Sequence, residues 1–221
     1  ALLPWLFVLL WSTGFIGAKF GLLYVEPLTF LTLRYAIVLV LMVAVALVLR
    51  APWPRSARQW LHIGVSGLFV HGVYLAGVFT AIAHGLPSGV TALVVGLQPL
   101  ITALVAGTLL GESVRPRQWA GLALGFTGVA LVVAGKIASV PVHALLAMLV
   151  PAVVALAGIT AGTLYQKRFC PSFDLRTGSV IQYLPCLVAT GALALATETM
   201  QVRWSGEFLF ALGWLVLVLS V

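Results

Sequence analysis

Residues 28–49 read LTFLTLRYAIVLVLMVAVALVL, an apolar run of 22 residues in which Arg34 is the one charged side chain. At about 1.5 Å per residue, a helix of this length crosses the hydrocarbon core of a bilayer, which is about 30 Å thick. Similar apolar stretches fill most of the remaining sequence, separated by short gaps that carry most of the charge. We therefore predict eight helical stretches, at 2–24, 28–49, 60–83, 88–110, 118–134, 143–165, 178–196 and 208–221.

The composition excludes a soluble globular domain. Hydrophobic residues make up 62% of the chain and charged residues 8%, and the mean hydropathy is +1.15. A soluble protein of 221 residues needs a more polar surface than this. Only helices and closed barrels satisfy their backbone groups inside lipid. Since the stretches lack the alternating pattern of barrel strands, we predict an all-α polytopic membrane protein.

The basic residues in the gaps predict an orientation. Cytoplasmic loops of membrane proteins carry an excess of Lys and Arg. Eight such residues follow the second, fourth and sixth stretches, and two follow the first, third, fifth and seventh. The eight are Arg50, Arg55, Arg58, Arg115, Arg117, Lys167, Arg168 and Arg176, and the two are Lys136 and Arg203. We therefore expect a cytoplasmic N-terminus and a bacterial inner membrane, and we attribute the net charge of +7 to topology rather than to nucleic-acid binding.

The two ends of the sequence suggest that it belongs to a longer chain. The first residue is not Met, and the last apolar stretch has about 14 residues, which is short for a membrane span. The first stretch also lacks the basic leader of a signal peptide and carries Lys19 where a cleavage site would need small residues. We expect about two further helices beyond Val221.

A weak internal similarity relates the first and sixth stretches and continues into the next pair. Leu33-Arg34-Tyr35 corresponds to Ile181-Gln182-Tyr183. A repeat of five helices has an odd number of crossings, so its second copy is inserted upside down, as in many secondary transporters. We expect a first repeat over residues 1–135 and an incomplete second repeat over residues 136–221, with ten helices in the whole protein.

Three motifs resemble the EamA-like family of the drug/metabolite transporter superfamily. They are WSTGFIGAK at 11–19 with Arg34-Tyr35, FTAIAHGLPSGVTALV at 79–94, and QPLITALVAGTLLGE at 98–112 followed by QWAGLALGFTGV at 118–129. The resemblance extends over the whole chain. It implies ten helices in two inverted repeats, cytoplasmic termini and export of small metabolites.

The acidic residues all lie in gaps or at the ends of stretches: Glu26, Glu112, Asp174, Glu198 and Glu207. Charged groups inside a bilayer are costly and usually functional. The absence of acidic residues at mid-membrane disfavours a binding site for organic cations and a proton relay through carboxylates. Ion coupling would then depend on His71 or on helices beyond this sequence, and facilitated diffusion stays open. We expect no cofactor and no metal site.

The interior polar residues are candidates for the substrate site. His71 and Tyr74 lie one helical turn apart, and they either pack between helices or line a wet cavity. Arg34 and Lys19 either extend to the headgroups or offer positive charge to a carboxylate or phosphate, with Lys19 at the outer mouth. Trp11 either stacks on a substrate or faces lipid.

Further candidates lie on four stretches. Thr13 lies at mid-depth beside Trp11, and Gln98 offers an amide next to Pro99, whose ring is expected to bend a gating helix. Tyr165 and Tyr183 are expected at the inner mouth or in an interfacial aromatic belt.

These residues favour a secondary transporter that exports small metabolites by alternating access through a central cavity between the repeats, with amino acids or related zwitterions as the expected substrates. The alternatives are an uncoupled facilitator of broad specificity and a membrane protein that handles lipids or assembles complexes. The sequence contains none of the mid-membrane residue pairs that an intramembrane enzyme would need. We expect the bilayer and a small molecule as partners, no nucleic acid, and a monomer or weak homodimer.

Overall fold

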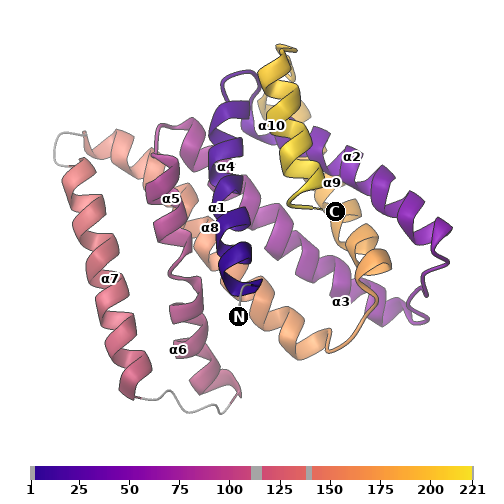
Figure 1. Cartoon of the computed structure of the whole chain (residues 1–221), viewed down its shortest axis with the longest axis horizontal. Coiled ribbons are helices and arrows are strands. Elements are labelled where there is room, and N and C mark those ends of the chain that lie inside the picture. Colours follow the sequence, from indigo (N-terminus) through magenta and orange to yellow (C-terminus); the bar gives the residue numbers. More distant parts are fainter. Residues whose placement is uncertain (1–2, 111–115, 138–140, 221) are drawn as a thin grey trace.

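The computed structural model describes residues 3–110, 116–137 and 141–220, and the described residues are almost entirely helical (Figure 1). Each apolar stretch of the sequence becomes helix. The segments are α1 (Leu3–Gly21), α2 (Pro27–Val48), α3 (Ala57–Gly67), η1 (Leu68–Val73), α4 (Tyr74–Ala83), α5 (Ser88–Val95), α6 (Gln98–Leu110), α7 (Pro116–Ile137), α8 (Val142–Phe169), α9 (Leu175–Thr197) and α10 (Gly206–Leu217).

Two of the predicted helices contain an irregular turn. The third continues without interruption from α3 to α4, and its middle, η1, is wound as a wider π-helical turn. The fourth is broken into α5 and α6 at Gly96 and Leu97, two residues before Pro99. Five of the described helices are long and apolar enough to cross a membrane, counting 57–83 and 88–105 each as one. The protein is thus an all-α polytopic membrane protein.

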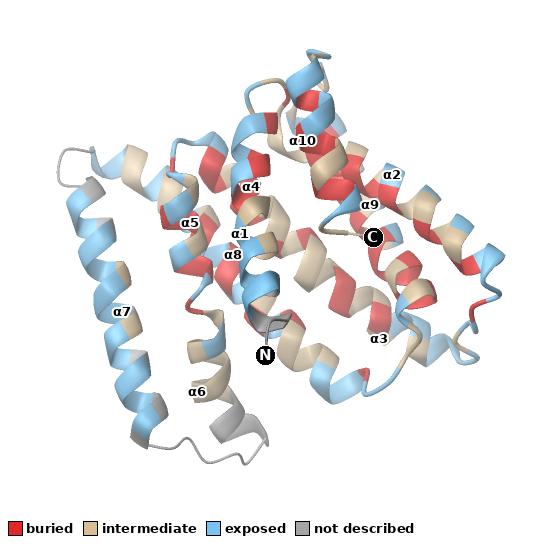
Figure 2. Ribbon diagram, in the orientation of Figure 1, coloured by how far each residue is buried: buried red, intermediate tan, exposed pale blue. Residues whose placement is uncertain are grey.

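Helices from distant parts of the sequence form the core of the molecule. The central pair is α2 and α9, while α4 packs on α8 and α1 packs on α10. Phe30 of α2 connects these helix pairs. Its ring centre lies 5.2 Å from that of Phe79 on α4 and 5.3 Å from that of Phe208 on α10. Figure 2 shows the buried positions concentrated on these helices, whereas α7 at the margin is largely exposed. In a bilayer these exposed apolar side chains face lipid.

Two loops close one end of the helix bundle. Val25 and Val202 form an antiparallel bridge between the α1–α2 and α9–α10 connections. The Glu26 carboxylate accepts hydrogen bonds from the Thr199 hydroxyl (2.6 Å) and backbone N–H (2.7 Å), which hold its pKa below the ordinary value. The Glu198 carboxylate accepts from two backbone N–H groups in the first turn of α2, at 2.8 and 2.7 Å. These acids therefore serve as helix and loop caps, outside the interior.

The Arg-rich connections meet at the opposite end. The Thr177 hydroxyl of α9 donates to the Pro52 carbonyl (2.9 Å), and the Gln59 amide donates to the Ser172 carbonyl (3.4 Å). The α2–α3 and α8–α9 connections therefore share one side of the molecule, as the alternation of charge in the sequence requires. Arg115 and Glu112, on the α6–α7 connection, lie outside the described residues.

Candidate functional site

A cavity of about 330 Å³ lies at the centre of the bundle, where α1, α2, η1, α4, α8 and α9 converge. Five of the predicted site residues line it: Trp11, Arg34, His71, Tyr74 and Tyr183. The rest of the wall is apolar and includes Phe15, Val78, Phe79 and Ile159. Mostly apolar walls with a few convergent polar groups are typical of small-molecule sites.

Arg34 brings a buried positive charge to this cavity. The Arg34 side chain belongs to α2 and is 5% exposed. Its Nε and Nη2 donate to the Ser220 hydroxyl at 3.2 and 2.9 Å. Within the described part of the chain, no carboxylate forms an ion pair with it. A buried guanidinium that lacks a counter-ion favours the binding of an anionic group.

The π-helical turn supplies Val70 and His71 to the wall of the cavity. Such turns insert one extra residue into a helix and are frequent at functional sites. The Tyr35 hydroxyl donates to the His71 carbonyl in this turn at 2.8 Å. The His71 ring stacks on Tyr183, with ring centres 4.4 Å apart, and Tyr183 in turn lies 5.6 Å from Tyr35. His71 and Tyr183 thus line the cavity, and the fully buried Tyr35 supports both of them through these contacts.

Small residues allow the α8 wall to approach this turn closely. A Cβ atom added at Gly158 would lie 2.8 Å from Val73 Cγ1, and one added at Gly162 would lie 2.6 Å from Val70 Cγ2. The spacing of four residues places both glycines on one face of α8. Close packing is therefore the role of this pair.

Trp11 supplies an aromatic wall from α1. Its ring makes an edge-to-face contact with Phe15 at a centroid distance of 4.9 Å, which is a favourable geometry for aromatic pairs. Trp11 and Tyr74 both line the cavity. A substrate with an apolar or aromatic body would therefore contact rings on two sides.

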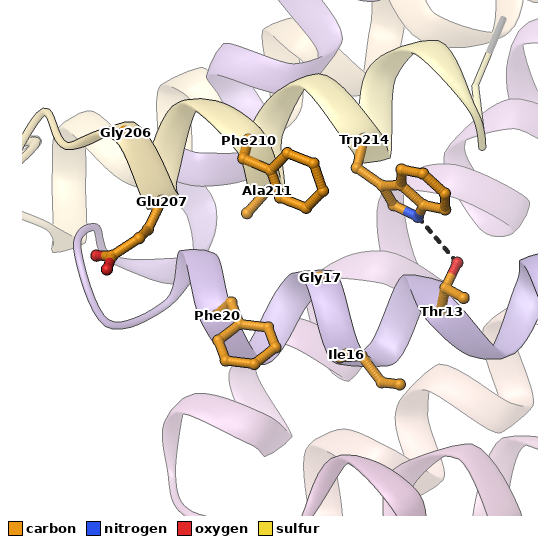
Figure 3. Close-up of a pocket in the computed structure, with 9 residues that line it drawn as sticks. All are labelled: Thr13, Ile16, Gly17, Phe20, Gly206, Glu207, Phe210, Ala211 and Trp214. Atoms are coloured by element: carbon orange, nitrogen blue, oxygen red, sulfur yellow. Dashed lines mark hydrogen bonds between the residues drawn. The ribbon is translucent and has the colours of Figure 1, made fainter.

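Thr13 lies in a different hollow. Two residues beyond Trp11, it faces α10 and accepts a hydrogen bond from the Trp214 indole N–H at 2.9 Å (Figure 3). This hollow between α1 and α10 has a volume of about 560 Å³ and is bordered by Phe20 and Phe210 (Figure 3). The structure thus assigns Thr13 to helix–helix contact.

The other predicted residues also lie away from the central cavity. The Gln98 amide donates to Thr102 (3.3 Å) and Thr163 (3.4 Å), so it joins α6 to α8 beside the helix break. The Tyr165 hydroxyl bonds to His62 at 2.6 Å, nearer the Arg-rich end. Pro99 lies in the first turn of α6, and Lys19 is exposed near the end of α1.

Some residues of the site could not be identified from sequence. Ser220 accepts hydrogen bonds from Arg34, which lies 186 residues earlier in the sequence. In the sequence it is a single Ser in an apolar stretch. Phe15, Phe79 and Ile159 resemble any other apolar residue of a membrane helix. Only the tertiary packing, in which α1 contacts α4 and α10, α2 contacts α9 and α4 contacts α8, brings these residues to one site.

The chain is similar in sequence to known membrane proteins. A sequence model described as the EamA-like transporter family matches residues 1–134. This chain belongs to that family. An uncharacterized transporter of Bacillus subtilis (strain 168) is 30% identical over 228 residues, covering 98% of this chain and 73% of the relative. An uncharacterized inner membrane transporter of Escherichia coli (strain K12) is 25% identical, covering 96% and 68%.

A third relative covers the first part of the chain. A protein of Escherichia coli (strain K12) named probable amino-acid metabolite efflux pump is 32% identical over 128 residues, or 58% of this chain and 40% of that relative. The chain spans less than half of the length of this relative. The family resemblance expected from the three sequence motifs is confirmed, and it favours a transporter over an enzyme.

Proposed function

We propose that this EamA-like chain forms the substrate cavity of a secondary transporter that exports small metabolites across the inner membrane. The observation that carries the proposal is the central cavity, in which a buried guanidinium without a carboxylate partner among the described residues lies beside aromatic walls. Amino acids and related zwitterions are the substrates we propose, since the E. coli relative is named as an amino-acid metabolite efflux pump.

The helix packing supports an inverted repeat, on which alternating access would depend. In the proposed repeat, the first, second and third helices correspond to the sixth, seventh and eighth. The pair α4–α8 then corresponds to α10–α1, and α2–α9 lies on the symmetry axis; all three pairs are in contact. The corresponding residues Tyr35 and Tyr183 also meet, with ring centres 5.6 Å apart. A cavity between such halves is the usual location of a transport site.

The Arg-rich connections support a cytoplasmic location for that end of the bundle and for the N-terminus. On this orientation, Arg34 would hold the substrate carboxylate by charge-assisted hydrogen bonds. Trp11 and Tyr74 would contact its apolar part. Tyr183, stacked on His71, would bound the cavity from α9.

An uncoupled facilitator is the second candidate. No Asp or Glu lines the described part of the cavity, so within it a proton relay would depend on His71. Transport that is independent of a pH gradient would favour this mode, whereas transport that ceases without the gradient would favour proton coupling.

Efflux from sealed vesicles tests the proposal. The full-length protein should move a labelled aromatic amino acid, and Trp11→Ala should reduce the rate. Trp5→Ala is the matched control, because Trp5 lies on the same helix but is 73% exposed toward lipid. Correctly folded protein that moves no member of a broad metabolite panel would contradict the proposal, and so would equal effects of the two Trp variants.

A further inference from the structure

Two adjoining hollows lie at the end of the bundle that carries the Arg-rich connections. The first has a volume of about 380 Å³, lies between the start of α3 and the end of α8, and is lined by polar side chains that include Ser56, Arg58, Gln59, His62, Arg168 and Ser172. The second, of about 770 Å³, is an apolar groove between α6 and α8. Arg168 and Phe169 line both hollows, so the two lie side by side.

Two guanidinium groups border the polar hollow. Arg58 Nε donates to His62 Nε2 at 3.4 Å, and His62 Nδ1 lies 2.6 Å from the Tyr165 hydroxyl. The Phe169 ring stacks on His62 at 5.0 Å, and the Arg168 guanidinium lies over Phe169, 5.7 Å from its centre. His62 and Phe169 thus connect the two arginine side chains and hold each in position.

These two charges have no acidic partner in the described part of the chain. At this end of the bundle the ion pair is formed by Arg176 and Asp174, at 2.6 Å. Neither Arg58 nor Arg168 takes part in it. Two guanidinium groups in one hollow are the arrangement that binds phosphate oxygens, because each planar fork offers parallel N–H donors.

The apolar groove begins beside the polar hollow at Arg168 and Phe169 and follows α8 back to Val153. Its α8 wall is a single stripe from Val153 through Ala157 and Ala161 to Arg168, and Ile101 lies on the α6 wall. Fifteen residues of helix extend about 22 Å, which exceeds the roughly 15 Å of one leaflet's hydrocarbon. The groove can therefore hold an acyl chain.

We propose that the two hollows form one site for an anionic phospholipid, with its phosphate at Arg58 and Arg168 and an acyl chain in the α6–α8 groove. Basic clusters beside membrane helices attract anionic headgroups. A lipid in this position would contact α3, α6 and α8 together. A zwitterionic phosphatidylcholine would bring a cation toward the two arginines, so it should bind more weakly.

Native mass spectrometry of the full-length protein in detergent, titrated with phosphatidylglycerol or phosphatidylcholine, tests this site. We expect preferential retention of phosphatidylglycerol. Arg58→Ala and Arg168→Ala should each weaken its binding about tenfold, the value of a charge-assisted hydrogen bond. Arg55→Ala removes the same charge three residues before Arg58, but Arg55 does not line the hollow, so this change should alter the affinity by less than about twofold.

Two further measurements separate the lipid from other anions. Ala161→Trp should fill the groove and weaken lipid binding without removing any charge, provided that the variant keeps its thermal transition. Glycerol phosphate, which lacks acyl chains, should fail to displace the lipid. The proposal is overturned if glycerol phosphate displaces it at equal concentration, if Arg55→Ala weakens binding as much as Arg168→Ala, or if phosphatidylcholine binds equally well.

Discussion

Replacement of Arg34 by Met should separate stability from transport. The Arg34 side chain is 5% exposed, and its two hydrogen bonds both end on the Ser220 hydroxyl, at 3.2 and 2.9 Å. A guanidinium has five N–H donors, so the protein satisfies this charge poorly. Met fills similar space without charge, and Ser220 keeps its own bond to the Leu215 carbonyl at 3.0 Å. We expect the free energy of unfolding to stay constant or to rise by about 1 kcal/mol.

The same change should greatly weaken substrate binding. A carboxylate held by two charge-assisted hydrogen bonds would lose about 3 kcal/mol, or roughly a hundredfold in affinity. Substrate counterflow in proteoliposomes measures this loss, and thermal unfolding in detergent measures stability. Lys19→Met is the matched control, since it removes an equal charge from an exposed position, and it should change neither quantity. The reasoning is refuted if Arg34→Met unfolds the protein, or if it transports the carboxylate substrate like the wild type.

Two further changes test the packing of α3 on α9 and the connection between α8 and α9. Gly67→Ala should destabilise the protein by about 1–3 kcal/mol in a thermal unfolding assay. The new Cβ would lie 2.5 Å from the Cα atom of Gln182, and a backbone atom cannot move aside. Gly121→Ala is the control and should be tolerated, because its new Cβ would have no described neighbour within 4 Å. The hydrogen bond from Arg176 lowers the pKa of Asp174 to about 2, so the stabilisation it gives should be complete above the unfolded pKa of about 4 and disappear as the pH falls through the folded value. Asp174→Asn should flatten the loss of melting temperature in this acidic range, and an unchanged profile would contradict the assignment.

The helices themselves could be predicted from sequence. All eight apolar stretches are helical, because lipid leaves the backbone no other means of satisfying its hydrogen bonds within a single segment. The two irregular turns could not be predicted from the sequence. The π-helical turn at 68–73 has no Pro, and the break at Gly96 precedes the Pro99 that suggested a bend. Both depend on how neighbouring helices pack.

The candidate site was predicted in part. Trp11, Arg34, His71, Tyr74 and Tyr183 share one cavity, since interior polar and aromatic residues of membrane helices face other helices more often than lipid. The remaining candidates have other neighbours, because a difference of two residues along a helix turns a side chain by about 200°. Thr13 therefore faces α10 although Trp11 faces the cavity (Figure 3).

The sequence by itself determined that this is an all-α membrane protein, because the length and apolarity of each stretch match the hydrocarbon core and the charges fall in the gaps. Its motifs, and not its composition, carry the likeness to the EamA-like family. Only the tertiary structure decided which side chains meet. Arg34 and Ser220 are 186 residues apart, yet they are hydrogen-bonded. Arg58 and Arg168 are 110 residues apart, yet they line the same hollow. Such meetings depend on crossing positions and rotations of helices, which packing sets and which local sequence does not encode.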